Sequence, residues 1–435
     1  MMISFSRSRL RSIAQRRWVL RPMMDPSSMP ATQLQGWRAI ALQYAVQAFS
    51  FASMATIGLS LVVTSWVAAE LGSISLVGQL FFIGSATSLL FSIFAGVIVD
   101  TRNRYTVVQS GQALRLLGGA ILVSGFLAPE FLRLGLFAYT LFFSLGTILN
   151  AGAVEGIVQR AVAELDRMKL TIRVSIARQV GMLCGTGLGG VLMHNATEIA
   201  SVATMIGLML FQFVLIFVFF APYQNTPSKT SINVILSWKQ GLKAIWQQSQ
   251  LLLAIASVGL FFSTSQMANV LMPGFVKYTL NQGSDIYGLL ETAWAVGGGA
   301  MLATAAVQSR LLKSSLAEFA VLALIGVLMI VFASSRNIPL LVALYAGLGG
   351  LFALGRAICD GRILILARNE EIGRVRAATT MLISLFGMMI YISPTLLGLS
   401  NPTPYYIAWG AVMTLCGLFL IAFKAKRHLK QQEVA

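Results

Sequence analysis

Long apolar runs separated by short polar gaps make up most of this chain. A run of roughly 20 apolar residues crosses a bilayer core of about 30 Å as an α-helix, and only helices or closed barrels satisfy their backbone hydrogen bonds in lipid. Twelve runs are long enough, at about 39–69, 74–99, 106–128, 134–160, 172–194, 199–221, 250–276, 284–307, 315–335, 338–365, 375–398 and 403–424. The pattern predicts an all-α membrane protein with twelve transmembrane helices and both termini on one side.

The longest internal polar gap, 222–249, divides these runs into six plus six. It begins as a Pro- and Ser-containing linker, and its later apolar residues fall on one helical face, which is typical of a short amphipathic helix on a membrane surface. A partner-binding role for this segment is the alternative to a plain linker. We therefore expect five parts: a basic extension (1–38), a six-helix bundle (39–221), the linker (222–249), a second bundle (250–424) and a basic tail (425–435).

Positive charge is distributed unevenly between the gaps. One set of gaps holds most of the basic residues, namely Arg102, Arg104, Arg167, Lys169, Lys229, Lys239, Lys243, Arg310, Lys313, Arg368, Arg374 and Arg376. The opposite set holds only Arg133, Lys277 and Arg336. Because Lys and Arg accumulate in cytoplasmic loops, the first set and both termini are predicted to be cytoplasmic.

Composition agrees with a lipid environment. Of the 435 residues, 57% are hydrophobic and 11% are charged, and the mean hydropathy is +0.77. The net charge of +17 lies in short gaps and forms no basic domain, so it favours membrane orientation over nucleic-acid binding. The three cysteines are far apart, which predicts neither a disulfide framework nor a metal site, and nothing in the sequence calls for a cofactor.

The first 24 residues contain six arginines, four serines and no acidic residue. That composition resembles an organellar transit peptide. The alternatives are a cytoplasmic basic tail, or a start codon placed too early, with Met23, Met24 or Met29 as the true one.

Charges gather at the turn "AGVIVDTRNRYTVV" (Ala95–Val108), between the second and third apolar runs. Orientation explains the arginines here, but it does not require Asp100. An aspartate among arginines forms a charge-assisted network that holds neighbouring helix ends together. Such a network can be intact in one state of a transporter and broken in another.

This turn resembles the major facilitator superfamily motif Gly-x-x-x-Asp-Arg-x-Gly-Arg. Gly96, Asp100 and Arg104 match its first, fifth and ninth positions, while Thr101 replaces its first arginine and Arg102 lies one place off. The resemblance implies that this turn is an inner gate, in which Asp100 helps to close the cytoplasmic side against helix eleven.

A second motif carries the same resemblance. In "GMLCGTGLGG", the glycines Gly181, Gly185, Gly189 and Gly190 match the Gly-x-x-x-Gly-Pro-x-x-Gly-Gly of the superfamily's exporters, with Thr186 in place of proline. Small residues at this spacing also let membrane helices pack closely, so helix packing is the alternative role.

Two further stretches, Tyr287–Gly299 and Ala367–Ala377, resemble the efflux branch that includes the enterobactin exporter and macrolide efflux proteins. The resemblance implies a multi-pass protein of the bacterial inner (plasma) membrane. It also implies that spans one, four, seven and ten line a central cavity.

Ionisable residues inside membrane spans are costly and mark candidate functional sites. They are Arg115, Glu155, Glu291, Glu318, Arg356 and Asp360. Arg356 and Asp360 are one helical turn apart and can pair. We expect Glu155, Asp360 and Glu291 to be candidates for proton coupling, although Glu155 could instead pair with Arg115 or Arg356 or lie exposed at a helix end.

Polar stripes on two spans complete the candidate cavity. Gln43 and Gln47 share a face of span one, and Gln266 and Asn269 share a face of span seven. With Arg115 and Arg356, they are expected to contact substrate or, alternatively, to hydrogen-bond neighbouring helices.

The sequence therefore predicts a monomeric secondary transporter that exports a siderophore or drug-like molecule by alternating access, driven by proton antiport. It has no ATP-binding Gly-x-x-x-x-Gly-Lys-Ser/Thr signature. The alternatives are an importer or a lysophospholipid flippase of the same fold. An intramembrane enzyme is a remote alternative, because the sequence lacks His-Glu-x-x-His and Gly-x-Ser-x-Gly motifs.

Overall fold

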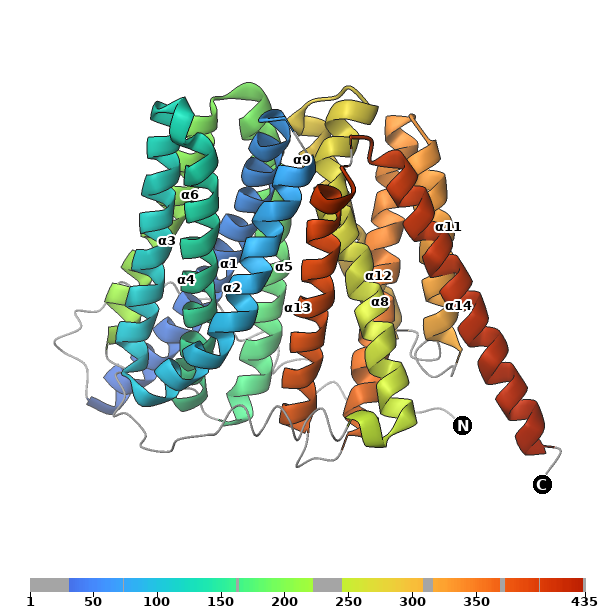
Figure 1. The fold of residues 1–435 in the computed structure, drawn as a ribbon. Coiled ribbons are helices and arrows are strands. Elements are labelled where there is room, and N and C mark those ends of the chain that lie inside the picture. The colour runs from blue at the N-terminus through green and yellow to red at the C-terminus, as the bar shows by residue number, and fades with distance from the viewer. Residues whose placement is uncertain are drawn as a thin grey trace, which may run out of the picture.

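A computed structural model describes residues 31–72, 74–161, 164–221, 245–307, 316–367, 372–398 and 400–432. These residues form twelve long helices, which confirms the predicted all-α membrane fold (Figure 1). The helices are α1 (Ala31–Glu70), α2 (Ile74–Thr101), α3 (Arg104–Leu127), α4 (Leu132–Ala161), α5 (Glu164–Asn195), α6 (Glu198–Leu215), α8 (Ser249–Gly274), α9 (Ser284–Val307), α11 (Ala317–Ser334), α12 (Ile338–Leu366), α13 (Ile372–Leu397) and α14 (Thr403–Gln432). By length and composition, eleven helices of the described part can cross a membrane, and α9 is the twelfth long helix.

Local sequence explains where several helices begin. Asn103, Thr197 and Asn337 cap α3, α6 and α12, each accepting a hydrogen bond from a backbone N–H of the first turn. These caps satisfy donors that a helix start leaves open. The tight α1–α2 turn requires Gly72, whose φ of +115° suits glycine.

Some helices extend beyond the apolar runs that predict them. The helix α1 begins at Ala31, inside the predicted basic extension, α5 begins at Glu164 rather than 172, and α14 continues to Gln432. Helical hydrogen bonding does not end where lipid ends, so hydrophobicity marks the buried core of a helix better than its ends. The linker predicted over 222–249 lies outside the described residues as far as 244.

Two short π-helical segments continue transmembrane helices. The first, η3 (Ile216–Phe220), follows α6, and the second, η5 (Phe275–Thr279), follows α8. Pro273 lies in the last turn of α8. Because proline has no N–H to donate, it disturbs the regular helical ladder near this point, and the π turn follows directly.

The helices form two bundles with the same plan. In the first bundle α1 packs on α5 and α6, α4 on α2 and α3, and α3 on α6. In the second, α8 packs on α13 and α14, α12 on α9 and α11, and α11 on α14. Replacing α1–α6 in order by α8, α9, α11, α12, α13 and α14 converts one pattern into the other, so the bundles are pseudo-symmetric.

The bundles meet mainly through two helix pairs, α5 with α9 and α2 with α13. The same replacement exchanges these two pairs, so the interface follows the symmetry. Figure 1 shows the two bundles side by side, with the start of α1 and the end of α14 on the same face.

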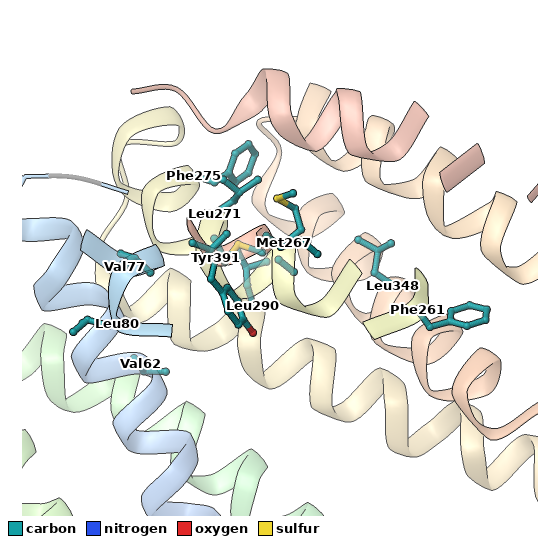
Figure 2. Packing of buried hydrophobic residues seen from close by; sticks show 14 of the residues in the cluster. Val62, Val77, Leu80, Phe261, Met267, Leu271, Phe275, Leu290, Leu348 and Tyr391 are labelled. Atoms are coloured by element: carbon teal, nitrogen blue, oxygen red, sulfur yellow. The ribbon is translucent and has the colours of Figure 1, made fainter. Parts of the chain in front are cut away.

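Buried apolar side chains of both bundles join in one cluster. Figure 2 shows Val62, Val77 and Leu80 of the first bundle in one view with Leu290 and Tyr391 of the second. Many large apolar side chains remain exposed, among them Phe217, Leu396 and Phe419. A surface with so many exposed apolar side chains suits contact with lipid tails.

Candidate functional site

Within the described part of the chain, contacts between the bundles cluster at the end of the molecule opposite the start of α1. On one side of this end, the Ser75 and Thr395 hydroxyls lie 2.7 Å apart, and Phe81 stacks on Tyr391 with 5.2 Å between ring centroids. Ser65 bonds to the Tyr287 hydroxyl at 2.8 Å. These residues lie near the α1–α2 turn, the start of α9 and the end of α13. The interface is therefore closed at this end.

On the other side of the same end, α5 and α9 touch backbone to backbone. A Cβ added at Gly190 would lie 2.7 Å from the Gly288 Cα, which is too close for any side chain. Thr186, in place of the motif's proline, lies 3.4 Å from the Thr292 hydroxyl. The exposed pair His194–Asp285, at 3.4 Å, ends this contact.

The predicted glycine stripe packs against α1 as well as α9. Added Cβ atoms at Gly181 and Gly185 would overlap the backbone of Phe51 and Ala55. One at Gly189 would lie 2.9 Å from the Val62 Cβ. Three glycines of the stripe therefore join α5 to its own bundle, and Gly190 joins it to the other.

Charged side chains are exposed on α12 and α4. Arg356 and Asp360 form the pair that their spacing allows, with Nε 3.6 Å from Oδ2 and side-chain exposures of 52% and 35%. The Arg356 guanidinium also lies 5.0 Å from the centroid of the Phe262 ring on α8. Glu155 is exposed on α4, the helix that corresponds to α12.

Glu291 lies inside the second bundle among tyrosines. It is 5% exposed, and the Tyr345 hydroxyl donates to it at 3.3 Å. Tyr287, one turn before it on α9, carries the hydroxyl that bonds to Ser65 of the first bundle. This buried carboxylate is therefore one helical turn from the closed end of the interface.

Arg115 is completely buried inside the first bundle rather than at its surface. Its guanidinium donates to Gln212 at 2.9 Å, Gln112 at 3.3 Å and Ser53 at 3.4 Å. It also lies 4.6 Å from the centroid of the Phe143 ring. The structure thus surrounds this cation with neutral partners from α1, α3, α4 and α6.

Sequence analysis missed an ion pair in the second bundle. Glu318, 1% exposed on α11, pairs with Arg362 of α12 and accepts from the Cys359 thiol at 3.8 Å. Arg362 follows the predicted pair Arg356–Asp360 on the same span. Glu318 and Arg362 are 44 residues apart in the sequence, so helical spacing could not predict this contact.

The polar stripes bond mainly to neighbouring protein groups. Gln47 donates to the Gln43 carbonyl at 3.0 Å, and both side chains are half-buried. Gln266 donates to the Ile383 carbonyl of α13 at 3.3 Å, and Asn269 bonds to Tyr391. The stripe on α8 therefore joins α8 to α13.

The charged turn connects α2 to α3. The side-chain surroundings of Gly96 and Asp100 lie outside the described residues. Arg102 is exposed and Arg104 is half-buried at the start of α3. Asn103 ends the turn by accepting from the Tyr105 N–H at 3.0 Å, so this position serves as a helix cap where the motif has glycine.

Twelve long helices in two matching bundles define a multi-pass membrane protein. The sequence profile described as Major Facilitator Superfamily matches residues 45–391, so the chain belongs to this superfamily of secondary transporters. No curated protein matches the sequence.

Among solved structures, the D323A mutant of the nucleoside transporter NupG resembles this chain with a TM-score of 0.67 at 12% identity, covering 88% of this chain and 99% of that one. A second structure of nucleoside transporter NupG gives a TM-score of 0.63 at 12% identity, with coverage of 88% and 98%. At this identity the likeness concerns the fold alone.

Proposed function

We propose that this transporter exports a small molecule from the cytoplasm in exchange for protons. The main support is that, among the residues that the structure describes, the bundle contacts cluster at one end, opposite the start of α1. With the basic loops and both termini in the cytoplasm, that end faces outward. The conformation is then closed to the outside, which is the state in which an exporter receives its substrate and an importer releases it. The resemblance of Gly181–Gly190 to the motif of the superfamily's exporters favours export.

The substrate site of this proposal lies between the bundles, along α4 and α12. Arg356 and Asp360 are partly exposed there, and Glu155 is exposed on the corresponding helix. Charged groups in a span face water or protein far more readily than lipid. The Arg356 guanidinium suits a substrate with carboxylate or catecholate groups, such as a siderophore or a charged drug-like metabolite.

Protons would be carried by carboxylates that the two states expose differently. Glu155 and Asp360 are the candidates nearer the termini, and Glu291 is the candidate nearer the closed end. At the opposite end, Asp100 with Arg102 and Arg104 would close the inner gate when the outer contacts open. Each half-cycle then presents one group of carboxylates to one side of the membrane.

The test compares culture media from cells with and without the gene, in low and high iron, by mass spectrometry. An iron chelator that is lost from the medium and retained in deleted cells supports siderophore export. Unchanged media with altered drug tolerance supports drug efflux instead. Loss of uptake of an external solute, such as a nucleoside, would contradict export.

Reconstituted vesicles test the coupling. An imposed pH gradient should drive the identified substrate in the direction opposite to proton flow, and collapsing the gradient should stop net flux. Saturable flux that does not depend on the pH gradient would contradict proton antiport and would indicate a carrier that works by facilitated diffusion.

A further inference from the structure

A half-open cavity lies in the first bundle, between α1, α2 and α4. Its volume is about 170 Å³, and its walls include Ser60, Thr64, Phe81, Phe143 and Ser144. It is separate from the exposed charges of α12 and from Glu155, none of which lines it. An apolar protein cavity of about 150 Å³ accommodates a benzene molecule, so this space fits one aromatic ring.

Most hydroxyl groups around the cavity are already bonded to protein. Thr64 donates to the Ser60 carbonyl at 2.7 Å, and Thr140 donates to the Leu136 carbonyl at 2.8 Å. The Tyr139 hydroxyl donates to the Ser60 hydroxyl at 2.7 Å. The surface left to an occupant is therefore largely methyl groups and rings, which favours an uncharged apolar group over an ion.

The cavity adjoins the contact between the bundles. Two residues of its wall, Ser65 and Phe81, are the ones that bond to Tyr287 and stack on Tyr391 of the second bundle. An occupant would therefore touch the side chains that hold the outer end closed.

We propose that this cavity binds an uncharged aromatic ring, or an apolar group of that size, belonging to the transported molecule. This inference rests on the proposed function and specifies its substrate. The molecule would carry at least one such ring in addition to the charged groups suited to α12. Filling the cavity would also press on Ser65 and Phe81, which links substrate binding to opening of the outer end.

The direct test is binding of fluorobenzene to the purified transporter in lipid nanodiscs, measured by ¹⁹F NMR saturation transfer from the protein. The variant Ser144→Phe fills the cavity from α4 and should weaken saturable binding at least about tenfold. Thr64→Leu narrows it from α1 and serves if the first variant does not fold. Ser124→Phe, on the exposed face of α3, adds the same ring elsewhere and should bind as the unmodified protein does.

Equal binding by Ser144→Phe and the unmodified protein, or no saturable binding by either, overturns the inference. A tightly held lipid, seen by native mass spectrometry, that fluorobenzene cannot displace and that Ser144→Phe releases would assign the cavity to an acyl chain and also overturns it. These results do not depend on transport.

The culture-medium comparison then separates the two proposals. Export that is lost in Ser144→Phe and kept in Ser124→Phe supports the cavity as a substrate site. Normal export by Ser144→Phe overturns the cavity's role and leaves the exporter intact. If the unmodified gene exports nothing, the proposed function fails, and fluorobenzene binding alone decides the cavity.

Discussion

The two bundles share one plan but bury opposite charges. In the first, the buried group is the Arg115 cation on α3, bonded to amides and a hydroxyl. In the second, two carboxylates are buried, Glu291 on α9 and Glu318 on α11. The helix α11 corresponds to α3, and the main partner of Glu318 is the cation of Arg362. Pseudo-symmetry of helices therefore does not extend to the chemistry of the cores.

The buried charges Arg115 and Glu318 also differ in whether their partners have other hydrogen bonds. Gln112, which accepts from Arg115, also accepts from the Asn150 amide at 3.0 Å, and Gln212 donates to Thr56 at 3.0 Å. Both glutamines therefore keep another bond if the cation is removed. Glu318 depends on a charge, and removing one member of a buried ion pair leaves the other uncompensated. The second core should be the more fragile.

The largest effect is expected from Arg362→Met. It removes the paired cation of buried Glu318 and leaves only the weaker attraction of Lys424, so the free energy of unfolding should fall by about 3 kcal/mol. Unfolding in mixtures of mild detergent and SDS measures it. Adding Glu318→Gln to this variant should recover most of the loss, and Arg133→Met, at an exposed position, should change stability by less than about 0.5 kcal/mol. If Arg362→Met is as stable as the unmodified protein, the second core is not the more fragile one.

A smaller effect is expected where the bundles meet. Gly190→Ala places a methyl group against the Gly288 backbone and should lower stability by about 1–3 kcal/mol. On the proposed orientation, labelling from outside of a cysteine introduced near Thr186 should also increase, because this end of the interface can no longer close. The control is Gly207→Ala on α6, where an added Cβ meets nothing within 4 Å. Equal behaviour of the two variants would show that the α5–α9 contact is dispensable.

Arg115→Met should have a smaller effect than Arg362→Met. One amide oxygen, that of Gln212, loses its donor, which corresponds to about 1–2 kcal/mol. The same SDS unfolding assay allows direct comparison. If Arg115→Met proves the more damaging variant, the first core relies on its charge after all, and the contrast between the bundles is wrong.

The smallest effects on stability are expected from Glu155→Gln and Asp360→Asn. Both side chains are at least partly exposed, so unfolding should change by less than about 0.5 kcal/mol. If either carboxylate carries the proton, its variant should export substrate at a rate that no longer depends on the pH gradient. A wild-type pH profile in both variants would leave Glu291 as the remaining candidate.

The apolar runs predicted the helices well because each run must cross the bilayer by itself. Helical spacing also placed Arg356 and Asp360 on one face, since four residues make about one turn, and the structure forms that pair. Arg115 and Glu318 were recognisable as charges inside spans, but their partners on other helices were not. Gln212 is 97 residues from Arg115, and only the packing of α3 against α6 brings them together.

The contact between Gly190 and Gly288 has a mechanical consequence. Two backbones that touch without side chains between them are held by close packing alone, near one end of α5. Gly190 is 26 residues from the start of α5 at Glu164, which is about 39 Å of helix. A rotation of α5 by roughly 10° about its start, comparable to known rigid-body transitions, would move Gly190 by about 7 Å and separate it from Gly288.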